Sequence, residues 1–129
     1  MEEALLEHLL TDATLAALVP DQAIRWAARE GDVCLALWLI GAPPDWHLKG
    51  ASGVIMSRVQ ADCWALDFLT AKAIGDAFKA ALPATGQVIG GTKFQGCVIL
   101  DTERTQTGEA PNVRHRTRID VRITHKPAT

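Results

Sequence analysis

Arginines alternate along one predicted strand near the end of the chain, and they are the side chains best suited to bind charged partners. Successive side chains of a strand point to opposite faces, so these arginines share one face, while His115, Thr117 and Ile119 share the other. Guanidinium groups match the geometry of phosphates and carboxylates. The candidate surface for passing DNA or an acidic neighbouring subunit consists of Arg58, Arg114, Arg116, Arg118 and Arg122. The alternative is a solvated outer sheet face, on which Asp62 and Asp120 pair with nearby arginines.

Residues that could support catalysis or bind a metal do not form a recognisable site. The four histidines lack metal-type spacing. The three cysteines each lie in an apolar run, which predicts buried thiols in a reducing compartment. Cys63 is predicted to face the apolar side of its strand, where a thiol stays protonated and inert. We therefore expect no enzyme activity, no metal and no cofactor.

A strand joined directly to a helix is the clearest structural signal. Small or apolar residues alternate with polar ones from Val54 to Trp64, which is typical of a strand buried on one face. After Asp67 the apolar residues recur at helical spacing as far as Leu82. Asp67 stands where an N-cap belongs. Gly75 inside this helix predicts a close contact with the sheet or with the first helix.

Shorter signals predict the other elements. They are a helix over Glu2–Leu10, a second short helix that Thr11-Asp12 caps and that ends before Pro20, and strands over Val33–Ile40, Phe94–Asp101 and Arg114–His125. The stretch Ile24–Ala28 predicts a short edge strand, and the alternative is a helical segment over Gln22–Arg29. Gly41–Gly53 predicts an irregular connection or a short extra strand. Together they predict an α+β two-layer sandwich, in which two helices cover one face of a mostly antiparallel sheet of four or five strands.

The run Val33–Ile40 is apolar on both faces of its predicted strand. Helices cover only one face of a sheet in a two-layer domain, and large exposed apolar patches are rare on monomers. A partner subunit is therefore predicted on the other face, unless a loop of the same chain covers it. The candidate interface residues are Val33, Leu35, Leu37, Trp38 and Leu39.

The polar segment Thr102–Val113 is long for a connection between two strands. Long loops without structure of their own are often functional or disordered. This one could project from the domain and become ordered only in an assembly, or it could be a mobile tip. Its candidate contact residues are Thr102, Glu103, Arg104, Gln106, Glu109 and Asn112.

Length and charge limit the possible classes of protein. The 129 residues predict a single domain over 1–129. The net charge of −2 gives no overall attraction to nucleic acid or to acidic membranes. A membrane-spanning helix needs about 20 apolar residues, and the longest apolar run is the predicted strand Val33–Ile40. The start Met1-Glu2-Glu3 is acidic, unlike that of a secretory signal. We expect no membrane partner.

Three segments together resemble one protein family. They are R-V-Q-A-D-C-W-A at Arg58–Ala65, T-A-K-A at Thr70–Ala73 and D-T-E-R at Asp101–Arg104, preceded by the more generic D-A-T-L-A-A-L-V at Asp12–Val19. The pattern is similar to that of small phage and prophage tail-completion proteins. The resemblance carries a fold and a structural role, and it involves no catalytic motif.

The resemblance implies a structural protein of the virion, assembled in the cytoplasm of a bacterial host. Such proteins form a ring, usually a hexamer, at the neck of the particle, on the head-proximal end of a long tail tube. The ring stops polymerisation of the tube and provides the surface that joins the head. The implied partners are copies of the chain itself, the tail tube protein and the head–tail connector protein, with DNA only passing through the lumen. The alternatives are a host-side interaction module and a small oligomeric enzyme.

Overall fold

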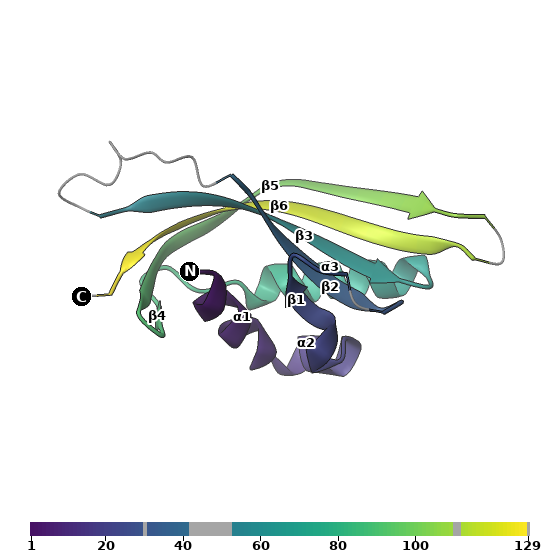
Figure 1. Cartoon of the computed structure of the whole chain (residues 1–129), viewed down its shortest axis with the longest axis horizontal. Helices are drawn as coiled ribbons and strands as arrows, with labels where there is room; N and C mark the ends of the chain where they lie inside the picture. Colours follow the sequence, from purple (N-terminus) through teal and green to yellow (C-terminus); the bar gives the residue numbers. More distant parts are fainter. Residues whose placement is uncertain (30, 42–52, 110–111, 129) are drawn as a thin grey trace.

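The computed structural model describes residues 1–29, 31–41, 53–109 and 112–128. In these residues one six-stranded sheet carries three α-helices on a single face (Figure 1). The strand order across the sheet is β1-β2-β3-β6-β5-β4. The helices are α1 (Glu2–Leu10), α2 (Ala13–Leu18) and α3 (Phe68–Ala81), with a 3₁₀ turn η1 (Asp21–Ala23). The strands are β1 (Ile24–Trp26), β2 (Cys34–Gly41), β3 (Ile55–Ala65), β4 (Val88–Ile89), β5 (Thr92–Thr107) and β6 (Arg114–Pro127).

The strand–helix unit predicted from the change in periodicity is confirmed. β3 leads into α3, and the Asp67 carboxylate accepts hydrogen bonds from the backbone N–H and the hydroxyl of Thr70, at 2.7 Å and 2.9 Å. Asp12 caps α2 in the same way, since its carboxylate accepts from the Leu15 N–H at 2.9 Å. Each cap satisfies an amide of the first helical turn that has no partner within the helix.

The α+β class and the single helical layer are confirmed, but the layer has three helices where two were predicted, and the sheet is larger and mixed. It has six strands where four or five were predicted, and β1 pairs in parallel with β2 while the other described pairs are antiparallel. The helical alternative before β1 is confined to the three residues of η1. The connection predicted over Gly41–Gly53 falls mainly on residues 42–52, outside the described residues.

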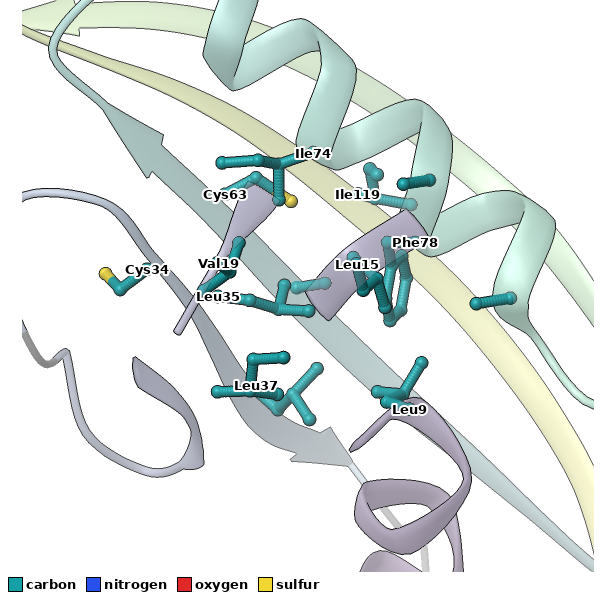
Figure 2. Close-up of a cluster of buried hydrophobic side chains, with 14 of the residues drawn as sticks. Leu9, Leu15, Val19, Cys34, Leu35, Leu37, Cys63, Ile74, Phe78 and Ile119 are labelled. Carbon is teal, nitrogen blue, oxygen red and sulfur yellow. The ribbon is translucent and has the colours of Figure 1, made fainter. Parts of the chain in front are cut away.

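The core lies between the helices and the inner face of the sheet, and it corrects part of the predicted interface. Leu35 and Leu37 of β2 are fully buried. Figure 2 shows them among side chains from the helical layer, which include Leu15 and Val19. Their prediction as subunit contacts is therefore wrong, because the short helix α2 already covers this end of the sheet. Val33 is half-buried and packs against the same core.

The predicted loop Thr102–Val113 is also corrected. Thr102, Glu103, Arg104 and Gln106 all belong to β5, which pairs with β6 as far as Thr107–Arg114. The composition was misleading because both faces of this part of the strand are largely exposed, so no apolar alternation marks it. Three threonines within six residues, Thr102, Thr105 and Thr107, were the available signal, because β-branched side chains favour strands.

Candidate assembly surfaces

The outer face of the sheet, opposite the helices, brings the five predicted arginines together on β3 and β6. Cross-strand register places Arg58 beside Arg122, and Trp64 beside Arg116. Ion pairs within the chain hold several of these side chains: Arg58 lies 3.5 Å from Asp120, and Arg118 contacts Glu103. The alternative interpretation of a solvated, internally paired face thus describes much of this surface.

Two further arginines of the predicted set have partners near one end of the sheet. Arg114 contacts Asp32 at 3.1 Å, and the Nε of Arg116 donates to the Thr105 hydroxyl at 3.2 Å. Trp64 has one guanidinium 3.9 Å from its ring centroid, that of Arg29, and a second at 5.3 Å, that of Arg116. Cation–π contacts of this kind stabilise stacked arginines. Arg116 is therefore held in place by its own chain.

Arg122 is the predicted arginine with the most available charge. It is exposed, and it has no ion pair within the described residues, where its cross-strand neighbours are Arg58 and Val98. The Arg58 side chain is 53% exposed despite its contact with Asp120. Since exposed ion pairs contribute little, both guanidinium groups can reach an external anion.

The part of the predicted subunit interface that remains at the surface lies at the β2 edge. Leu39 is 42% exposed and Trp38 is half-buried. They line an open groove of about 470 Å³ together with residues of α1 and the end of β1: Glu2, Glu3, Leu6, Trp26 and Ala27. Ile40, 49% exposed, extends this apolar edge and was not among the predicted contacts.

A second apolar patch lies at the other side of the sheet, on β5. Val98, Ile99 and Leu100 are 46%, 38% and 43% exposed. A bulge between Ile99 and Asp101 interrupts the strict alternation of the strand, so three consecutive apolar side chains reach the surface. Sequence reasoning assigned this stretch to a strand that is apolar on both faces but did not predict it as a contact site. The signal was the same one that singled out Val33–Ile40.

The β5–β6 hairpin ends near the start of α3. The residues predicted as loop contacts that do lie in its turn are Glu109 and Asn112, and the Asn112 N–H donates to the Glu109 carbonyl at 2.7 Å. The rings of Phe68 and His115 meet edge to face at 6.3 Å. Exposed apolar side chains gather at this end of the sheet: Leu66, Phe68 and Leu69.

Burial favours the neutral forms of two thiols and one imidazole in the domain. Burial raises the pKa of the Cys63 thiol far above its ordinary value, and burial raises that of Cys97 to about 11. His125 forms a buried 2.8 Å hydrogen bond with the Ser57 hydroxyl, and burial together with the nearby N-terminal ammonium lowers the pKa of its imidazole. Neither member of this pair is accessible, since Ser57 is 3% and His125 7% exposed. The Ser–His contact is therefore a packing feature.

Two kinds of feature are absent from the described residues. No group of three or more histidine, cysteine, aspartate or glutamate side chains is placed there to hold a metal ion. No described helix combines the length and hydropathy needed to cross a bilayer.

Comparison with known proteins gives a family and a structural relative. The family described as "Tail completion protein gp17" matches residues 3–125. A chain from a structure entitled "Virion of native gene transfer agent (GTA) particle" has a similar fold, with a TM-score of 0.73 and 20% sequence identity. The alignment covers 98% of the present chain and 94% of that chain. No curated protein matches the sequence.

Proposed function

Because the chain belongs to the tail completion protein gp17 family, and is thus a phage tail structural protein, we propose that it caps the head-proximal end of a long tail tube. In this role copies of the chain form a ring, usually a hexamer, at the neck of the particle. The ring stops tube polymerisation and presents the surface that binds the head. The family match, which spans residues 3–125, is the observation that carries this proposal.

The exposed surfaces of the domain support a role in assembly with other protein chains. The sheet retains exposed apolar strand residues at both sides, and its outer face carries the charged groups described above. A closed ring buries such apolar surface without leaving an open end. The proposed partners are copies of the chain, the tail tube protein and the connector protein, and the complex forms in the bacterial cytoplasm.

The hairpin end is the proposed contact with the ring above or below. It carries the turn residues Glu109 and Asn112 next to the exposed apolar side chains at the start of α3. The proposed contact with passing DNA, or with an acidic neighbour, is the pair Arg58 and Arg122. Replacing both with glutamate tests that contact, and E103R/R118E, which swaps an internal ion pair, is the matched control. If particles assemble equally well with both double variants, the pair Arg58 and Arg122 has no role in assembly.

Deletion of the gene in the parent phage or prophage tests the proposed role. The expected result, by electron microscopy of the lysate, is filled heads beside unattached tails, many of irregular length. Expression of the wild-type gene from a plasmid should restore joined particles. Normal infectious particles after deletion would refute the proposal.

A further inference from the structure

The two apolar edges of the sheet are matched to each other, and we infer that they bind head to tail between copies of the chain. The open edge of β5, at Val98–Leu100, pairs with the open edge of β2, at Trp38–Gly41, on the next copy. This contact between copies rests on the proposed function in one respect, namely that the resulting oligomer is the ring on the tail. It identifies which surfaces make that ring.

Each side of the sheet ends in a strand too short to cover its neighbour. β1 pairs with β2 only at Leu35–Leu37, and β4 pairs with β5 only at Thr92 and Lys93. Within the described residues no strand pairs with the outer edge of β2 after Leu37 or with that of β5 after Phe94. Exposed apolar strand edges are templates for pairing with another chain.

The backbone at Ala27 ends β1 early. Its φ of 55° lies in the left-handed region, which residues other than glycine seldom adopt. The Ala27 N–H still donates to the Leu37 carbonyl at 2.7 Å, and it is the last such bond before the chain leaves the sheet. The turn at Ala27 therefore leaves the outer edge of β2 unpaired, within the described residues, where its apolar side chains become accessible, from Trp38 onward.

The cross-strand register places the two open edges at the same height in the sheet. Leu39 pairs with Val59, Val59 with Val121, and Val121 with Ile99. One row thus runs across four strands from one exposed patch to the other. The adjacent row ends at Gly41 on β2 and at Val98 on β5, through Arg58 and Arg122. A neighbouring copy placed beside the first needs no shift along the strands to bring the patches together.

The direction of the strands also fits. From β2 to β5 the sheet passes through three antiparallel pairings, so β5 runs opposite to β2. When the sheet continues into a copy related by rotation, β5 therefore meets the neighbour's β2 in the antiparallel sense. Antiparallel ladders are slightly more stable per residue than parallel ones. Ile99 shares the inner face with Val121, so it faces the neighbour's Leu39 and the groove beside it.

The test uses two variants that each damage one edge. Ile99→Glu places a charge on the β5 patch, and Leu39→Glu places one on the β2 patch. Ala80→Glu, at an exposed position of α3 away from both edges and from the hairpin end, is the matched control. Since all three positions are exposed, far-UV circular dichroism and thermal unfolding should remain close to wild type. Sedimentation is measured up to about 1 mM protein, which detects even weak association.

The wild-type chain and Ala80→Glu should self-associate, and each edge variant should weaken association at least about tenfold, because a buried charge without a partner disfavours contact. Mixing the two edge variants is the decisive measurement. Each retains the edge that the other lacks, so the mixture should form a 1:1 dimer and nothing larger. A wild-type chain that stays monomeric, or a mixture without dimer, overturns the inference. Association that persists in either edge variant alone indicates a symmetric contact and also overturns it.

Solution behaviour and tail assembly report separately on the two proposals. If deletion leaves particles intact while the mixed variants dimerise, the edge contact stands and the role in the tail falls. If deletion releases unattached tails but the mixture stays monomeric, the role stands and the edge assignment falls.

Discussion

Replacement of Gly75 by alanine should destabilise the protein, although alanine is the better helix former. Gly75 lies on the face of α3 that packs on the sheet. A Cβ atom at this position would lie 2.8 Å from Cγ2 of Thr117 and 3.4 Å from Cδ1 of Ile119. Two carbon atoms prefer a separation of about 3.5–4.0 Å, so Thr117 or the helix must move by roughly 1 Å.

The expected magnitude is a balance of two effects. Alanine gains about 1 kcal/mol over glycine within a helix, whereas overpacking a core costs typically about 1–3 kcal/mol. Thr117 cannot easily yield: it is 2% exposed, it is paired on both sides, with Cys63 and Arg104, and its β-branched side chain has restricted rotamers. The overpacking effect should therefore win, with a net loss of about 1 kcal/mol in the free energy of unfolding and a fall of about 4 °C in Tm.

Urea denaturation followed by tryptophan fluorescence measures this free energy, and Thr117→Ser provides the control. Serine lacks the Cγ2 methyl that the new Cβ would meet. In the Thr117→Ser background, Gly75→Ala should therefore stabilise the protein by up to about 1 kcal/mol, so the effect changes sign between backgrounds. If Gly75→Ala stabilises the wild-type chain, the close contact does not constrain the helix and the reasoning is refuted.

Three further outcomes follow from the caps and the titratable groups. Asp67→Ala should lower Tm near neutral pH, and the difference in Tm from wild type should shrink in strong acid. The reason is that the Thr70 N–H holds the pKa of the Asp67 carboxyl below its ordinary 3.8, so the stabilisation by this cap is lost as pH falls through the lowered pKa. The Tm of the wild type should fall as pH falls below about 6.5, because burial lowers the pKa of His125 in the folded state and the unfolded chain takes up the proton first. The Tm of His125→Gln should depend less on pH in this range, and equal slopes for the two proteins would contradict this explanation. Ellman's reagent at pH 8 should react slowly with the thiols of the native protein, because Cys34 and Cys63 are fully buried and burial raises the pKa of Cys97 to about 11. All three thiols should react quickly once the protein is unfolded in denaturant.

Elements fixed by local chemistry could be predicted from the sequence. The change of period at Asp67 involves neighbouring residues alone, and its cap forms as expected. The alternation along β6 likewise predicted its two faces, since Thr117 and Ile119 are buried while the arginines lie opposite. The close approach at Gly75 was also predicted, although only the structure identifies Thr117 as its neighbour.

Features that depend on tertiary arrangement could not be predicted. Leu35 and Leu37 belong to an apolar run whose composition does not reveal which face the short helix α2 covers. β1 joins the sheet through three residues, too few to display a period. The ion pairs of the outer face, such as Arg118 with Glu103, connect strands whose register the sequence leaves open. The predicted arginines share the outer face, while the charge still available on them depends on that register.

The arrangement of the remaining apolar surface favours two perpendicular directions of contact. Helices cover the inner face of the sheet, and charged side chains occupy much of the outer face. Exposed apolar residues remain at the two lateral edges and at the hairpin end, beside Leu66 and Leu69. Contacts through the two edges extend the sheet perpendicular to its strands, whereas the hairpin end points along the strands. Pairing at the edges therefore leaves the hairpin end free. If the chain forms the proposed ring through these edges, the ring can bind a different partner through the hairpin end, as the proposed cap between tube and head requires.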